Sequence, residues 1–204
     1  MGRALTSRGE ERRRQLLDTA TAAFAEHGYH TTSVADIVER LGVAKGVFYW
    51  YFESKEALFL EVLERAQRDL RGAHEVAIAE EADPLRRLEV GIRSSLTWLE
   101  ANRSVLALFQ IAATEDRFVG ALRAGEEALA SELAGHLKEA IVAGRIPDGD
   151  PQVLAYAVLG AIDALAQTFL GRPGAWDDGV ADTAVAFCLG GLLATRRSGE
   201  SASS

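Results

Sequence analysis

Residues 28–58 have the sequence GYHTTSVADIVERLGVAKGVFYWYFESKEAL, and this stretch decides how the N-terminal part of the chain folds. Ser33, followed three residues later by Asp36, resembles a capping box in which Asp replaces the usual Glu. This box predicts a short helix over residues 34–41 with its apolar side chains turned inward. The helix is expected to end at Gly42, because glycine adopts positive φ at little cost.

A second short helix is predicted over residues 44–51, directly after this turn. Val43 is an apolar plug that lets the two helices share a small core with Ile37 and Phe48. Two short helices joined by a turn that contains glycine form a helix-turn-helix unit. Such a unit presents the first residues of its second helix to the major groove of DNA.

The flanking sequence is almost entirely helical in pattern. A helix is expected over 9–27, and Ser54 is expected to cap a long helix from Lys55 to about residue 79. Apolar stripes and turn residues predict further helices in the ranges 85–99, 105–112, 122–141, 152–170 and 177–196. The expected fold class is therefore all-α.

Residues 9–60 closely resemble the DNA-binding domain of the TetR (tetracycline-repressor) family of bacterial regulators. The shared pattern is Gly-Val, then Lys-Gly and an aromatic run that ends in Phe, then Ser-Lys-Glu-x-Leu. The resemblance implies a three-helix helix-turn-helix domain over 9–60. It also implies a larger helical effector-binding and dimerisation domain over 61–197. Residues 1–8 and 198–204 are expected to be disordered.

The resemblance and the chemistry of the side chains together select the candidate DNA contacts. The N–H groups of Ser33 and Val34 can hold a phosphate, and Lys45 can reach a phosphate or a base edge. Gly46 lets the backbone approach DNA closely. Tyr51 can instead pack against the first helix. The full set of expected DNA-binding residues is Ser33, Val34, Lys45, Gly46, Val47, Tyr49, Trp50, Tyr51 and Lys55.

Three positions depart from the family pattern. Ala44 stands where a Ser often caps the recognition helix, so that cap is missing. Val47 replaces a common Thr and can pack on a thymine methyl group. Trp50 replaces a frequent His or Tyr and keeps only an indole N–H. These departures concern base preference rather than the mode of binding.

The last two predicted helices are rich in small residues. Glycine in a helix interior costs about 1 kcal/mol relative to alanine, which close packing of another helix would explain. We predict a homodimer in which these helices pair across a two-fold axis, as the resemblance implies. The alternative is an ordinary pair of helices within one chain. The expected interface residues are Ala157, Gly160, Ala161, Ala164, Ala184, Gly190, Gly191 and Ala194.

The effector pocket is less sharply defined by the sequence. Tyr156, Asp163 and Gln167 share one face of an apolar helix, which can line a pocket, the dimer seam or solvent. Four aromatic residues are candidates for an apolar pocket wall, and the resemblance implies a cavity among these helices. These four are Trp98, Phe109, Phe118 and Phe169.

Composition narrows the function classes. The 204 residues carry a net charge of -8, and residues 1–60 are neutral, with eight Lys and Arg against eight Asp and Glu. One cysteine, Cys188, excludes an internal disulfide. The N-terminus lacks the apolar stretch of a signal peptide, and we expect a cytoplasmic protein without a membrane partner. No catalytic, metal-binding or cofactor-binding signature is recognised, so no enzyme activity, metal or cofactor is expected.

These observations predict a ligand-responsive transcriptional regulator, most simply a repressor. It would bind a palindromic DNA operator as a homodimer and would release it when a small-molecule effector binds. The alternative is an all-α ligand-binding or scaffolding protein that does not bind DNA.

Overall fold

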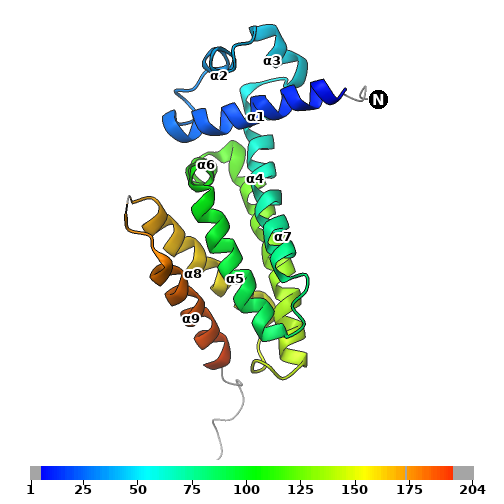
Figure 1. The fold of residues 1–204 in the computed structure, drawn as a ribbon, viewed down its shortest axis with the longest axis vertical. Helices are drawn as coiled ribbons and strands as arrows, with labels where there is room; N and C mark the ends of the chain where they lie inside the picture. Colours follow the sequence, from blue (N-terminus) through cyan, green and yellow to red (C-terminus); the bar gives the residue numbers. More distant parts are fainter. Residues whose placement is uncertain (1–5, 173, 195–204) are drawn as a thin grey trace, which may run out of the picture. The chain divides into compact units, whose positions relative to one another are not determined.

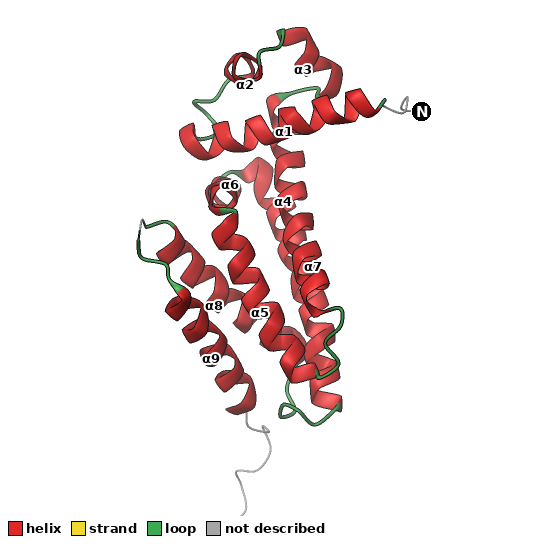
Figure 2. Cartoon of the chain, in the orientation of Figure 1, coloured by secondary structure: helices red, strands yellow, loops and turns green. Residues whose placement is uncertain are grey.

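The computed structural model describes residues 6–172 and 174–194, and every regular element in this part of the chain is a helix (Figure 2). The expected all-α fold class is therefore confirmed. The elements are α1 (Ser7–His27), α2 (Val34–Leu41), α3 (Lys45–Tyr51), α4 (Lys55–Ile78), α5 (Pro84–Ala101), α6 (Arg103–Thr114), α7 (Asp116–Val142), α8 (Pro151–Leu165), η1 (Ala166–Leu170) and α9 (Asp178–Ala194). The element η1 is a single π-helical turn that continues α8.

The short helices α2 and α3 form for the local reasons that the sequence predicts. The Ser33 hydroxyl accepts the Asp36 N–H at 3.1 Å, and the Asp36 carboxylate accepts the Ser33 N–H at 2.7 Å. Gly42 ends α2 in the left-handed region at φ 68°. Ala44, by contrast, gives α3 no side-chain cap. The predicted capping box and glycine turn are both confirmed.

The described residues form two compact units. The first unit contains the residues up to Gln67 together with Ser104–Arg123, and the second contains Arg68–Arg103 together with the chain from Ala124 onward. Helices α4 and α7 are both long (Figure 1), and each contributes residues to both units. The sequence-based limits of 9–60 and 61–197 stay predictions. The sequence did not predict that residues 104–123 belong to the first unit.

The interior of the first unit is apolar and rich in aromatic rings. Phe24, Tyr29, Phe59 and Phe118 form a cluster with ring centroids 4.3 to 5.6 Å apart. Ile37 and Phe48 join the same core, and Val43 packs against it from the turn. The Asp18 carboxylate pairs with Arg65 at 2.7 Å and so joins α1 to α4. These contacts fix the position of the helix-turn-helix within its unit.

The second unit combines an apolar pairing of helices with a row of polar side chains. Helix α9 packs against α5 and α8, and η1 packs against α5. Between α4 and α7, Arg71 pairs with Glu132 at 3.2 Å, and the rings of His74 and His136 lie 6.1 Å apart. We call these four residues the polar row.

The boundaries of two helices bear on the sequence-based expectations. Helix α1 begins at Ser7, where the Thr6 hydroxyl accepts the Gly9 N–H at 3.3 Å. Ser7 and Arg8 were expected to be disordered, and this expectation is wrong because the cap extends the helix. Thr6, also in the range expected to be disordered, is the cap itself. The other residues of that expectation, 1–5 and 198–204, lie outside the described part of the chain, as do the last residues of the predicted helix 177–196.

Candidate functional site

The outward face of α3 carries four of the expected DNA contacts. Lys45, Gly46, Tyr49 and Trp50 are all exposed, with 53% of Tyr49 and 74% of Trp50 accessible to solvent. At 100° per residue these four positions span about 140° of the helix surface. Phe48, on the opposite side, is fully buried and anchors the helix to the core. We call the four exposed residues the α3 face.

Two further predicted contacts on α3 lie beside this face rather than on it. Val47 and Tyr51 are half-buried, and Tyr51 packs against the core of the first unit. The sequence left open whether Tyr51 packs inward, and its position favours packing. Burial of Phe48 and Tyr51 is what turns Tyr49 and Trp50 outward.

Ser33 and Val34 do not present a pair of free N–H groups. The N–H of Ser33 donates to the Asp36 carboxylate at 2.7 Å, so the expectation of a free donor at this position is wrong. Hydrogen bonds from Ser33 hold the pKa of Asp36 below its ordinary value, so the carboxylate stays charged. A negative charge here opposes a phosphate at the start of α2. Val34 is half-buried.

Lys55 is held within the first unit by several groups. Its ammonium donates to the carbonyl oxygens of Tyr29 and Thr32, at 2.8 Å each, and lies 4.3 Å from the centre of the Tyr29 ring. Burial, followed by the charge of Arg117, lowers the pKa of Lys55. Lys55 therefore fastens the segment between α1 and α2 to α4. The Lys55 ammonium is thus engaged within the protein rather than presented to a phosphate.

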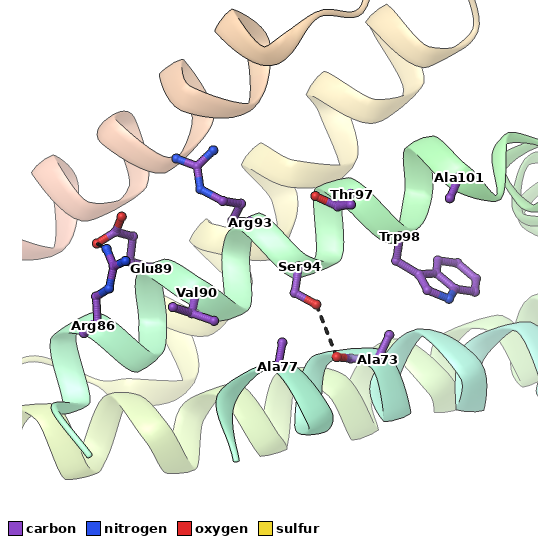
Figure 3. Close-up of a pocket in the computed structure, with 10 residues that line it drawn as sticks. All are labelled: Ala73, Ala77, Arg86, Glu89, Val90, Arg93, Ser94, Thr97, Trp98 and Ala101. Carbon is purple, nitrogen blue, oxygen red and sulfur yellow. Dashed lines mark hydrogen bonds and ion pairs between the residues drawn. The ribbon is translucent and has the colours of Figure 1, made fainter. Parts of the chain in front are cut away.

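The second unit contains a hollow between α4 and α5 (Figure 3), with a volume of about 490 Å³. Trp98, one of the four predicted pocket-wall aromatic residues, lines this hollow. The other lining residues, which were not expected from the sequence, are Ala73, Ala77, Arg86, Glu89, Val90, Arg93, Ser94, Thr97 and Ala101. Their side chains are scattered along two amphipathic helices, and spacing on one helix does not reveal a hollow formed by two.

Two of the predicted pocket residues belong elsewhere. Phe118 is fully buried in the aromatic cluster of the first unit, and Phe109 packs against the same core. Their assignment to a pocket wall in the second domain therefore needs correction. The physical reason is that residues 104–123 bury their aromatic side chains in the first unit. Phe169 is half-buried on η1 in the second unit.

Tyr156, Asp163 and Gln167 lie on the exposed side of α8 and η1. Asp163 accepts a hydrogen bond from the Gln167 amide at 2.7 Å, and 47% of Tyr156 is accessible. The sequence left pocket, dimer seam and solvent open for these residues. They lie on the same exposed stripe as most of the predicted interface residues of α8, and they do not line the hollow.

The predicted interface residues are mostly exposed. Ala157, Gly160, Ala164, Gly190, Gly191 and Ala194 are exposed, and Ala161 is half-buried. A Cβ atom added at Gly160 or Gly190 would meet no heavy atom within 4 Å. The alternative that these two glycines serve packing within one chain is therefore wrong. The assignment of Ala184 to the interface is wrong, because this residue is fully buried in its own unit.

Two large apolar side chains on the same stripes were not predicted. Val153 on α8 is 63% accessible and Phe187 on α9 is 70% accessible. Their spacing from Tyr156, Gly160 and Gly190 on each helix is the signal that would have found them. We call the exposed apolar and small residues of the two helices the α8–α9 face. Pro151–Leu170 is also long and apolar enough to cross a membrane by length and composition, a test that core helices of soluble proteins pass too.

The described residues contain no group of three or more His, Cys, Asp or Glu side chains that could hold a metal ion. Cys188 is buried, and burial raises the pKa of its thiol.

Known proteins that are similar to this chain in sequence are bacterial transcriptional regulators. The family model described as "Bacterial regulatory proteins, tetR family" matches residues 16–62. The transcriptional repressor KstR2 of Rhodococcus jostii is 35% identical over 105 residues, which cover 52% of this chain and 52% of that protein. The transcriptional activator FasR of Mycolicibacterium smegmatis is 35% identical over 91 residues, which cover 45% of this chain and 42% of that protein. The matches thus span about half the length of these relatives or less.

The solved structures extend the likeness to the whole fold. The regulator FadR of Bacillus subtilis, determined in complex with stearoyl-CoA, superimposes with a TM-score of 0.78. The match covers 89% of this chain and 97% of that one at 23% sequence identity. At this identity the likeness concerns the fold alone.

Proposed function

We propose that this chain, which belongs to the tetR family of bacterial regulatory proteins, is a ligand-responsive transcriptional repressor. It binds a palindromic DNA operator as a homodimer in the cytoplasm and releases the operator when a small-molecule effector binds. The observation that carries this proposal is the α3 face, an exposed set of contact residues on a helix whose opposite side is locked into a core.

The α3 face suits a nucleic-acid partner. Trp50 is a large aromatic residue left in solvent, and Lys45 on the same face supplies a positive charge. Gly46 carries no side chain, so the backbone can come close to the edges of the bases. The protein as a whole is acidic, with a net charge of -8, which opposes non-specific binding to phosphates. Binding therefore depends on a well-fitted local surface.

A second copy of the chain supplies a second α3, which contacts the other half of a palindromic operator. Two recognition helices about 34–36 Å apart contact successive turns of one DNA face, and this spacing is what a palindromic operator requires. The α8–α9 face exposes Val153, Tyr156, Phe187 and Leu193. Contiguous exposed apolar surface is typical of an interaction site. Homodimers commonly use such self-complementary faces.

The hollow between α4 and α5 supports a small-molecule effector. Its walls are largely apolar, and Arg86 and Arg93 stand at one end, paired with Glu89 and Asp182 at 2.6 and 2.7 Å. The fold-related FadR binds stearoyl-CoA, a molecule with an apolar chain and an anionic end. We infer that the effector of this chain also has an apolar portion. Release of DNA follows if the effector binds better to the conformation that does not fit the operator.

No catalytic role belongs to this proposal. The relatives KstR2 and FasR are described as a transcriptional repressor and a transcriptional activator.

The experiment that tests the proposal is selection of bound fragments from a pool of random duplex DNA by the purified chain. We expect recovery of a two-fold symmetric sequence. The Lys45→Ala/Tyr49→Ala variant should lose this binding by at least about 30-fold while it remains a folded dimer. Lys138→Ala is the matched control, because Lys138 is an exposed lysine in the second unit.

Recovery of no preferred sequence would contradict the proposal and would favour a helical binding or scaffolding protein. Loss of binding in the Lys138→Ala control, to the same extent as in the double variant, would also contradict the assignment of the α3 face.

A further inference from the structure

We propose that the α3 face reads guanine through Lys45 and the methyl group of thymine through Trp50, and that it leaves adenine and cytosine unread. This inference rests on the proposed function and specifies the half-site that the function requires. Its basis is the chemistry of the side chains that the fold leaves accessible on α3.

The α3 face offers hydrogen-bond donors but almost no acceptors. The whole of α3 has the sequence KGVFYWY, which contains no carboxylate and no amide side chain. The ammonium of Lys45 and the indole N–H of Trp50 are donors only, and the hydroxyl of Tyr49 is the one group that can also accept. Burial of Phe48 and the half-burial of Tyr51 remove the other aromatic residues from this surface.

This inventory determines which bases the face can recognise. In the major groove guanine presents two neighbouring acceptors, N7 and O6, whereas adenine presents the acceptor N7 beside a donor amino group and cytosine presents a donor amino group. Adenine is normally read by Asn or Gln and cytosine by Asp or Glu, and α3 has none of these. Lys45 matches the two acceptors of guanine.

Trp50 is placed to meet the thymine methyl group. Its indole is 74% accessible, and Gly46, one turn earlier on the same face, has no side chain to cover it. Val47 is the other apolar candidate, but it is half-buried at the edge of the face. Tyr49 rests edge-on against the buried Phe48 ring, with ring centroids 5.2 Å apart, and its hydroxyl is a group that can both donate and accept.

The experiment uses the full chain and the operator recovered by selection. We expect each half-site to contain one guanine whose replacement by 7-deazaguanine, which lacks N7, weakens binding by the wild type. The Lys45→Gln variant should prefer adenine over guanine at that position, which reverses a discrimination of about 5- to 150-fold. Lys138→Gln, with the same change of side chain in the second unit, should keep the wild-type preference.

A matched base substitution tests Trp50. Uracil in place of the contacted thymine removes only the methyl group, and it should weaken binding by the wild type but not by Trp50→Ala. Circular dichroism and sedimentation confirm that each variant is a folded dimer.

The possible results separate this inference from the function on which it rests. A chain that selects no operator contradicts both. A chain that selects an operator but shows the same base preference in Lys45→Gln as in the wild type retains the function and overturns the assignment of Lys45. Equal uracil sensitivity in the wild type and Trp50→Ala overturns the assignment of Trp50.

Discussion

The two units of this chain differ most in what they bury. The first unit closes around four aromatic rings, and its buried polar Thr32 has hydrogen-bond partners for its hydroxyl. The second unit instead holds the polar row between α4 and α7, in which His74 is buried and Arg71, Glu132 and His136 are half-buried. Among the described residues, four buried side-chain atoms lack a hydrogen-bond partner, and all belong to this row: Arg71 Nε, His74 Nδ1, Glu132 Oε2 and His136 Nδ1.

The aromatic interior of the first unit suits DNA binding, and the polar row of the second unit suits a response to an effector. A reading surface must be rigid, and an aromatic core fixes α3 in one position. Buried polar atoms without partners cost free energy, which a rearrangement or a bound molecule can recover. We therefore expect the second unit to be the part whose arrangement changes more easily. Each prediction below tests one side of this contrast.

The largest effect is expected at Phe118, which is fully buried in the first unit. Phe118→Ala removes one ring from the aromatic cluster and should lower the free energy of unfolding by about 3–5 kcal/mol. Trp98→Ala is the matched comparison, since this half-buried aromatic residue lines the hollow of the second unit and should cost less. Urea unfolding of both variants measures the difference. An equal or greater loss in Trp98→Ala would contradict the location of Phe118 in the core.

Phe118 also illustrates which features the sequence could predict. The capping box at Ser33 and the turn at Gly42 depend on neighbouring residues, so their geometry was predicted correctly. The partners of Phe118 and Lys55 come from segments far away in the chain. No local pattern identifies these partners, so Phe118 was assigned to a pocket wall from its residue type, and Lys55 was assigned to a phosphate from its type and the family resemblance.

Contacts between distant segments also explain why most predicted interface residues of α8 and α9 are exposed whereas Ala184 is buried. Both helices carry small and apolar residues on most sides, so periodicity alone cannot distinguish the inner side from the outer side. Packing against α5 decides it: Ala184 is buried and Gly190 remains exposed. On α3 the apolar and polar sides differ more clearly, because Phe48 is buried in the core and Lys45 is charged and exposed.

The second-largest effect is expected on the α8–α9 face. Phe187→Glu places a charge where the second copy is proposed to pack, and the dissociation constant of the dimer should rise by at least about 30-fold. Operator binding should fall with it, although the monomer stays folded. Val142→Glu is the control, because Val142 on α7 is 81% accessible. Analytical ultracentrifugation gives the oligomeric state. Dissociation of both variants, or of neither, would argue against this face as the interface.

A smaller effect is expected where the polar row meets α5. A Cβ atom at Gly91 would overlap the ring of His74, so Gly91→Ala should destabilise the chain by about 1–3 kcal/mol. Gly135→Ala is the control within the second unit, since nothing lies near its Cβ position. It should instead stabilise helix α7 by about 0.5–1 kcal/mol. Thermal unfolding should therefore show opposite shifts, and a stabilising Gly91→Ala would mean that His74 moves away at no cost.

The smallest effect is expected on acidification. Burial, followed by the nearby His136, lowers the pKa of His74 below its ordinary value of about 6.5, against the opposite influence of the Gly91 backbone and Glu75. The unfolded chain therefore takes up a proton near pH 6.5, whereas the folded chain does so only at lower pH. The free energy of unfolding should fall between pH 7 and pH 5.5, by at most about 1.4 kcal/mol per pH unit from this residue.

Removal of the titrating ring tests this assignment. His74→Gln should flatten the pH dependence between pH 7 and pH 5.5. Urea unfolding at several pH values provides the comparison. If His74→Gln keeps the wild-type slope, the loss of stability arises outside the polar row. The two units would then not differ in their response to protons, although their interiors differ in chemistry.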